Sequence, residues 1–101
     1  MIELNAYELA TTCDILKRYI KDGIVLAFGS RCNGEARKYS DLDLAICSNT
    51  PLDDLAFANM RADFDDSNLP FRVDIVNWAD LDEDFQAAIK QKSVEILNIS
   101  P

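Results

Sequence analysis

The sequence predicts an α/β domain in which helices cover a small mixed sheet of about three or more strands. One short apolar run, residues 24–28, and two alternating segments, residues 42–47 and 71–78, have the patterns of strands. Segments with helical spacing lie around and between them, which gives the order α-β-(α)-β-α-β-α. A chain of 101 residues has room for one such domain, residues 1–101, and no repeat, linker or low-complexity stretch divides it.

The first helix is predicted over residues 6–22. Asn5 followed by Glu8 has the pattern of a capping box, and apolar residues then recur at helical spacing until the next glycine, which favours a helix end. The continuous apolar run 24–28 predicts a strand that is buried on both faces. Beyond it, residues 30–37 predict a short helix or a loop.

The second strand, residues 42–47, has one apolar face and one acidic face. Leucine or isoleucine occupies every second position, while Asp41 and Asp43 point to the opposite side. Thr50 as an N-cap and a proline in the first turn then predict a helix over residues 52–65.

The third strand, residues 71–78, places alternate apolar side chains on one face and Asp74 on the other. Asp80 followed by Glu83 is a second capping box and predicts a last helix. We expect this helix to gather the following apolar residues on one side: Leu81, Phe85, Ala88, Ile89 and Ile96.

Composition narrows the classes of function. The formal net charge of -8 disfavours broad electrostatic binding to nucleic acid or to an anionic membrane. The three cysteines form no CxxC pair and histidine is absent, so a Cys/His zinc site has little support. The N-terminus lacks the basic start and apolar core of a signal peptide, and no apolar stretch reaches the roughly 20 residues that cross a bilayer. We therefore expect a cytoplasmic protein without a membrane anchor.

Three carboxylates lie in or beside segments that otherwise have the pattern of buried strands. Asp41 and Asp43 are two positions apart, so their side chains point to the same face, about 6.5 Å apart along the strand. Asp74 can join them if the second and third strands are neighbours. Carboxylates without histidine suit Mg²⁺ or Mn²⁺. Two such ions about 4 Å apart can stabilise both the attacking and the leaving oxygen in phosphoryl or nucleotidyl transfer.

A turn of glycine and serine directly follows the first strand. Gly29 and Ser30 can present backbone N–H groups and a hydroxyl to a phosphate, and Gly34 lets the loop bend towards the ligand. The segment is neither a Walker A motif nor GxGxxG, so a turn without a ligand is the alternative. Arg31 either contacts phosphate or is a solvated surface arginine beside Glu35.

Other polar and aromatic residues have structural interpretations. Arg72 is interpreted as an ion-pair partner of Asp74 rather than as a catalytic group. Trp78 is interpreted as a residue at the rim of the core, with stacking on a base as the alternative. The acidic runs 63–66 and 80–84 are interpreted as helix ends and solvated faces.

Four segments, taken in order along the chain, resemble the signature of the minimal nucleotidyltransferases of the DNA polymerase β superfamily. They are Gly29-Ser30-Arg31, Gly34, Ser40-Asp41-Leu42-Asp43-Leu44 and Val73-Asp74-Ile75-Val76. The similarity spans residues 24–76, about half of the chain. It implies a core like the palm of polymerase β.

The resemblance implies a role for each of these residues. Asp41 and Asp43 would bind two Mg²⁺ ions, and Asp74 would complete the catalytic metal site and help activate the attacking hydroxyl. The nucleotide triphosphate would be held by Gly29, Ser30, Arg31 and Ser40. Many family members have Ala-Arg before the second glycine. Cys32 and Asn33 stand there in this sequence, which leaves out a cation that could face the phosphates.

The implied function is transfer of a nucleoside monophosphate, AMP from ATP, to a hydroxyl acceptor on a partner protein by a two-metal mechanism. The resemblance also implies the partner: a small helical protein of the HEPN class, in a hetero-oligomer of the toxin–antitoxin kind. The alternative is an antitoxin-like binding module that masks this partner with weak or no catalysis. We expect Tyr7 and Tyr19 of the first helix, and Val94 and Leu97 of the last helix, to contact the partner.

Overall fold

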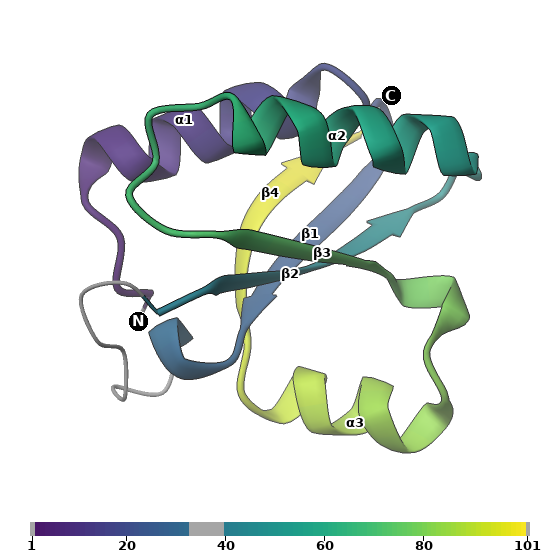
Figure 1. Ribbon diagram of the computed structural model, residues 1–101. Coiled ribbons are helices and arrows are strands. Elements are labelled where there is room, and N and C mark those ends of the chain that lie inside the picture. Colours follow the sequence, from purple (N-terminus) through teal and green to yellow (C-terminus); the bar gives the residue numbers. More distant parts are fainter. Residues whose placement is uncertain (1, 33–39, 101) are drawn as a thin grey trace.

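A four-stranded mixed sheet lies between two layers of helices in the computed structural model, which describes residues 2–32 and 40–100 (Figure 1). The strands are β1 (Gly23–Phe28), β2 (Leu42–Ser48), β3 (Val73–Asn77) and β4 (Val94–Ile99), in the spatial order β3-β2-β1-β4. β2 and β3 run parallel, and the other two pairings are antiparallel. The helices are α1 (Ala6–Lys17), α2 (Asp54–Asp65) and α3 (Glu83–Gln91), with the 3-10 turns η1 (Ser30–Cys32) and η2 (Trp78–Asp80). The predicted fold class is confirmed.

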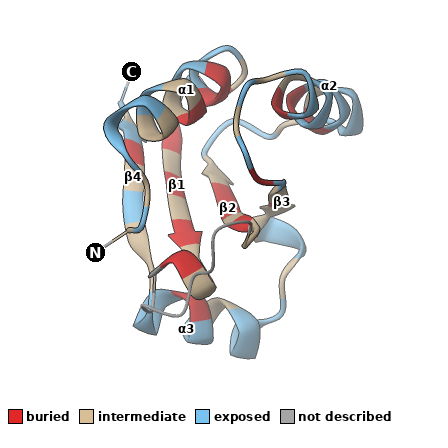
Figure 2. Cartoon of the chain, turned by 60° about the vertical axis from the view of Figure 1, so that its left-hand side comes forward, coloured by how far each residue is buried: buried red, intermediate tan, exposed pale blue. Residues whose placement is uncertain are grey.

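α1 and α2 cover one face of the sheet and enclose the main core (Figures 1 and 2). Leu42, Leu44 and Ile46 alternate along β2 and are fully buried beneath these helices. Residues paired across neighbouring strands point to the same face, which adds side chains from the other strands to this core. The wider set includes Leu16, Val25, Ala27, Met60, Ile75 and Leu97.

Capping fixes where the first two helices begin. Asn5 and Glu8 form the predicted capping box, in which each side chain accepts a hydrogen bond from the backbone N–H of the other, at 2.8 and 3.0 Å. The N-cap of α2 is Asp53 rather than the predicted Thr50, because the Asp53 carboxylate accepts from Ala56 N at 2.8 Å.

No helix within residues 2–32 and 40–100 is long and apolar enough to cross a membrane.

α3 covers part of the opposite face of the sheet. Ile89 packs inward and is buried, and Ala45 of β2 lies fully buried on the same side. The ring of Phe85 meets Phe28 of β1 edge-on, with the ring centroids 6.2 Å apart. The rest of α3 is largely exposed (Figure 2), so this face is more open than the one beneath α1 and α2.

The prediction of a single long last helix was wrong. α3 begins after Asp82, which caps it in place of Asp80, and ends at Gln91. Lys92 leaves the helical conformation with φ −137° and ψ 65°, and residues Val94–Ile99 form a strand that pairs with β1. The physical reason is that β1 has a second edge, and a segment that contains the β-branched residues Val94, Ile96 and Ile99 satisfies its hydrogen bonds.

This correction changes the expected partner surface. Val94 and Leu97 belong to β4 instead of a helix, and Leu97 is only 8% exposed. Tyr19 lies beyond the end of α1, is half-buried, and donates a hydrogen bond to Asp63. Of the four expected contact residues, Tyr7 is the large apolar side chain that is exposed.

Candidate active site

Strand register brings two of the three predicted carboxylates side by side. Asp43 lies opposite Asp74 in the parallel β2–β3 pair and opposite Phe28 in the antiparallel β1–β2 pair. Paired residues point to the same face, so Phe28, Asp43 and Asp74 form one row across three strands. Asp41 precedes the first residue of β2 by one position and approaches the same end of the strand. We call Asp41, Asp43 and Asp74 the acidic site.

The three carboxylates act on one another electrostatically. The pKa of Asp43 is raised above its usual value, first by partial burial and then by the negative charges of Asp74 and Asp41. Asp74 also pairs with Arg72, whose Nη2 lies 3.5 Å from Asp74 Oδ1. This is the ion pair predicted from the sequence. The side chains of this pair are 79% and 44% exposed, so water screens the interaction.

The acidic site fits a hard divalent cation in its donor chemistry. All of its donors are carboxylate oxygens, and their mutual repulsion is what a bound cation would relieve. No three Asp, Glu, Cys or His side chains in the part of the chain that the structure describes converge closely enough to hold an ion as they stand. The exposed Asp74 side chain would therefore have to turn from Arg72 towards an ion shared with Asp43.

Gly29 brings the glycine–serine turn against the acidic site. Its φ of +82° lies in the left-handed region that favours glycine. A Cβ atom at this position would lie 2.4 Å from Asp43 Oδ2, which is far inside van der Waals contact. The turn can approach the Asp43 carboxylate this closely only because residue 29 has no side chain.

Arg31 is buried, so the interpretation of a solvated surface arginine was wrong. The residue is 6% exposed. Its guanidinium donates to Ser40 O at 2.9 Å and to Glu3 O at 3.0 Å, and lies 4.1 Å from the centre of the Phe71 ring. Glu3 N in turn donates to Arg31 O at 2.8 Å. Arg31 therefore connects the N-terminal segment, the residue before Asp41 and the segment that leads into β3.

The other predicted nucleotide-binding residues are Ser30 and Ser40. Ser30 opens η1 and is half-buried, and Ser40 is half-buried with its carbonyl bonded to Arg31. Gly34, Asn33 and Glu35 lie outside the described residues, as does the side chain of Cys32. Ser30 directly follows Gly29 and Ser40 directly precedes Asp41, so both serines adjoin residues of the acidic site or of the turn against it.

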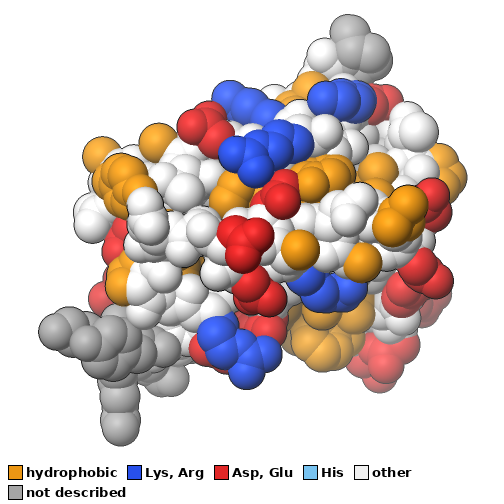
Figure 3. Space-filling view, turned by 45° about the horizontal axis from the view of Figure 1, so that its top comes forward, with side chains coloured by type: hydrophobic (Ala, Val, Ile, Leu, Met, Phe, Trp, Pro, Cys, Tyr) orange, Lys and Arg blue, Asp and Glu red, His pale blue; other side chains and the backbone are white. Residues whose placement is uncertain are grey.

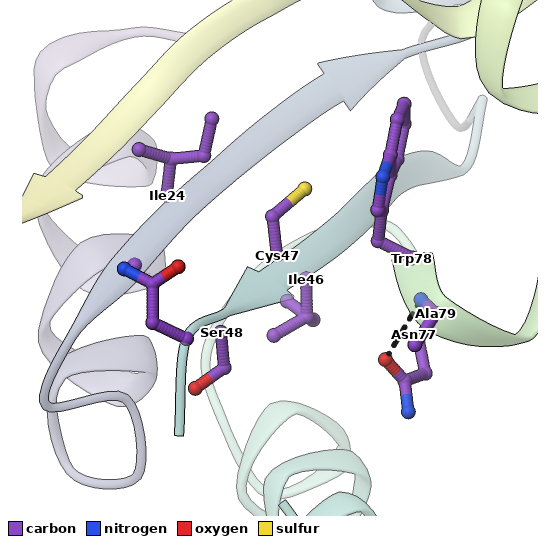
Figure 4. Close-up of a pocket in the computed structure, with 9 residues that line it drawn as sticks. Ile24, Ile46, Cys47, Ser48, Asn77, Trp78 and Ala79 are labelled. Atoms are coloured by element: carbon purple, nitrogen blue, oxygen red, sulfur yellow. Dashed lines mark hydrogen bonds between the residues drawn. The ribbon is translucent and has the colours of Figure 1, made fainter. Parts of the chain in front are cut away.

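Cavities in the part of the chain that the structure describes lie away from the acidic site. One, of about 400 Å³, lies at the opposite end of the sheet, where Ile24, Cys47 and Trp78 point to the same side (Figure 4). Trp78 is four residues beyond Asp74, about 13 Å along an extended chain, and Lys90 Nζ lies 5.5 Å from its ring centre. This placement favours the structural interpretation of Trp78.

The second cavity, of about 450 Å³, lies between α1 and α2. Asp14, Asp63 and Asp66 line it together with Arg18, which pairs with Asp63 at 3.2 Å. Figure 3 shows that acidic side chains gather near the middle of this face of the molecule.

Sequence reasoning missed two features of the site. The contact between Gly29 and Asp43 joins two motifs, but only the register of β1 and β2 shows that they meet. The contact of Phe85 with Phe28, the cross-strand neighbour of Asp43, also depends on which end of the sheet α3 covers. The signal in the sequence was limited to the spacing of Phe85 and Ile89, which placed both on the apolar side of the last helix.

Comparison with known proteins agrees with this geometry. Residues 11–101 match the family described as polymerase beta, nucleotidyltransferase. The chain is 46% identical over 95 residues to a Haemophilus influenzae protein named "Probable protein adenylyltransferase MntA", and the match covers 94% of this chain and 83% of that protein.

Solved structures share the fold. A toxin–antitoxin with AMP-PNP gives a TM-score of 0.76 at 21% identity, over 89% of this chain and 73% of the other. A mutant MntA–HpeT toxin–antitoxin gives a TM-score of 0.76 at 20% identity, over 94% of this chain and 74% of the other. Fold, signature and sequence similarity agree, and the chain belongs to the polymerase β nucleotidyltransferase family, as a relative of the minimal nucleotidyltransferase MntA.

Proposed function

We propose that this protein transfers AMP from ATP to a hydroxyl group on a partner protein by a two-metal mechanism. The observation that carries the proposal is the pairing of Asp43 with Asp74 in the sheet, with the glycine–serine turn held against Asp43. Nucleotidyl transfer needs acidic metal ligands and a phosphate-binding turn at one place, and this arrangement supports the assignment of both to this end of the sheet.

Each residue of the site has a role in this mechanism. Asp41 and Asp43 would hold two Mg²⁺ ions, or Mn²⁺, with Asp74 completing the site, and such ions stabilise charge on the attacking and leaving oxygens. The Ser30 hydroxyl and the backbone N–H groups after Gly29 bind the triphosphate. Asp74 orients the acceptor hydroxyl and accepts its proton as the new ester bond to the α-phosphate forms and pyrophosphate leaves.

Arg31 contributes to the nucleotide site from the position after Ser30, and Ser40 from the position before Asp41. The guanidinium of Arg31 donates hydrogen bonds to backbone carbonyls and contacts the Phe71 ring. Its positive charge therefore acts on the triphosphate from a buried position. Through Ser40 it also fixes the backbone next to Asp41. We therefore assign Arg31 mainly a positioning role.

The acceptor is proposed to be a small helical protein of the HEPN type in a hetero-oligomer. A relative named as a protein adenylyltransferase and neighbours described as toxin–antitoxin complexes support a protein acceptor and an antitoxin role. The net charge of -8 and the acidic side chains between α1 and α2 favour a basic partner surface over nucleic acid. A cytoplasmic location fits such a pair.

The test is to co-express the chain with its partner and measure the intact mass of the partner after incubation with ATP and Mg²⁺. We expect the partner to gain the mass of AMP with the wild type and not with the Asp41→Asn, Asp43→Asn double variant. An Asp54→Asn, Asp65→Asn variant is the matched control, because it removes the same charge from exposed positions of α2 that do not line the cavity between α1 and α2. A stable complex that never gains AMP would leave only the masking function.

A further inference from the structure

Three large apolar side chains are exposed in the part of the chain that the structure describes: Tyr7, Leu55 and Phe85. Phe85 differs from the other two in its position. Its ring centroid lies 6.2 Å from that of Phe28, and Phe28 lies directly opposite Asp43 in the β1–β2 register. An exposed aromatic ring therefore contacts the cross-strand neighbour of Asp43.

The exposure of Phe85 follows from how α3 sits on the sheet. Phe85 and Ile89 are four residues apart and lie on the same side of the helix. Ile89 is 3% exposed, whereas Phe85 is 47% exposed. On the apolar side of α3, the sheet therefore buries Ile89 but leaves much of the Phe85 ring exposed. This ring lies at the end of the sheet that carries Asp43.

The edge-on contact with Phe28 holds the Phe85 ring in a defined orientation. The two ring planes are at 89° to each other, the arrangement that aromatic pairs prefer. A T-shaped contact covers at most one flat surface of each ring, and Phe85 is 47% exposed, so its ring keeps a surface available for a planar ligand.

Charge decides which part of a nucleotide could lie there. The first turn of α3 carries Glu83 and Asp84, and Asp82 caps it. These acids repel phosphates from the neighbourhood of Phe85 but do not repel a neutral base. The triphosphate belongs at the glycine–serine turn and the acidic site, and the base is separated from it by one ribose. Phe85 contacts Phe28, and Phe28 is the cross-strand neighbour of Asp43.

We propose that Phe85, braced by Phe28, stacks against the base of the bound nucleotide. This inference rests on the proposed function, because it takes the nucleotide to be bound at the acidic site. Stacking on a ring tolerates different bases, so Phe85 contributes affinity more than discrimination between purines.

The test compares two ligands by calorimetry with the full chain in Mg²⁺: ATP and inorganic tripolyphosphate, which has no base. We expect Phe85→Ala to weaken ATP binding about tenfold and to leave tripolyphosphate binding within about twofold. Phe85→Tyr should keep wild-type affinity for ATP, because it keeps the flat ring. Leu55→Ala is the matched control, since it removes another exposed apolar side chain and should change neither affinity.

The outcomes separate this inference from the proposed function. Equal ATP affinity in wild type and Phe85→Ala, or equal weakening of both ligands, would overturn stacking. The Asp41→Asn, Asp43→Asn variant should lose Mg²⁺-dependent binding of both ligands, and its failure to do so would contradict the acidic site instead. A wild type that binds no ATP overturns both. Unchanged ATP affinity together with weaker binding of the partner protein would assign Phe85 to the protein interface and would also overturn stacking.

Discussion

At the scale of single residues, Arg31 is the side chain that joins the most distant segments of the site. It holds Glu3, Ser40 and Phe71 through two hydrogen bonds and a cation–π contact while almost fully buried. We expect Arg31→Met to lower the free energy of unfolding by about 2–4 kcal/mol, because backbone carbonyls would lose charged partners inside the protein. Urea denaturation monitored by circular dichroism measures this change.

The matched control is Arg72→Met, which makes the same substitution in a pair where the arginine side chain is 79% exposed. Its cost should be below about 0.5 kcal/mol. Similar small effects for both variants would mean that the Arg31 contacts contribute little to stability, and would favour a direct role in binding phosphate.

The acidic site also predicts a pH dependence of stability. The pKa of Asp43 is raised in the folded protein, mainly by burial and then by Asp74 and Asp41. Its contribution to stability is therefore fully present below the unfolded-state pKa and is lost as pH rises through the folded-state pKa. We expect Asp43→Asn to raise the melting temperature of the metal-free protein at pH 7, and this gain to disappear at about pH 3.5, where the unfolded-state carboxyl is largely protonated.

Melting curves of both proteins at several pH values, with a chelator present, measure this effect. Mg²⁺ should reverse it, because an ion bound to the native state stabilises the wild type more than the variant. A gain from Asp43→Asn that is the same at every pH would show that the effect comes from the amide side chain and not from the charge.

The acidic residues could be predicted because each stands out against a strand pattern. Asp74 has apolar neighbours on both sides, and Asp41 and Asp43 flank the first residue of an alternating strand. The burial of Arg31 could not be predicted, since nothing local to Gly29-Ser30-Arg31 specifies that Phe71, forty residues later, would lie beneath the guanidinium. Burial of a charged residue depends on distant segments, which a local pattern does not contain.

At the scale of elements, β4 is the part of the fold that local patterns missed. The capping signal at the start of α3 is strong, and Val94–Ile99 contains leucine and isoleucine at positions that also fit helical spacing. What decides between helix and strand is the open edge of β1, which is a property of the sheet. The first three strands were predicted because each has turn residues at its ends and either a continuous or an alternating apolar pattern.

The position of β4 leads to a prediction about Leu97. This side chain is 8% exposed and belongs to the core beneath α1 and α2. Leu97→Ala should lower the free energy of unfolding by about 2–4 kcal/mol, because it removes buried methyl groups and leaves a cavity. Glu95→Ala, two residues earlier on the same strand and exposed, should change it by less than about 0.5 kcal/mol. Equal costs at the two positions would contradict the inward orientation of Leu97.

At the scale of the whole molecule, the acid excess acts on stability and not only on partner choice. The chain carries a net charge of -8 within dimensions of 33 × 32 × 22 Å. At 0.01 M salt the screening length is about 30 Å, so nearly every acid repels every other, whereas at 0.15 M it is about 8 Å and only neighbours interact. Compact structure concentrates this charge, and repulsion therefore destabilises the folded chain at low salt.

We expect the melting temperature to rise by a few degrees between about 0.01 and 0.15 M NaCl, as self-repulsion is screened. The Asp65→Asn, Asp66→Asn variant changes the net charge from -8 to -6. Repulsion grows with the square of the net charge, so the rise in melting temperature of this variant should be about half that of the wild type.

The Asp41→Asn, Asp43→Asn variant has the same net charge as the Asp65→Asn, Asp66→Asn variant, but it loses the carboxylates that repel one another at close range. Its melting temperature should therefore respond least to salt. Identical responses in all three proteins would mean that neither the total charge nor the acidic site limits stability, whereas a difference between the two double variants would locate the repulsion at the acidic site.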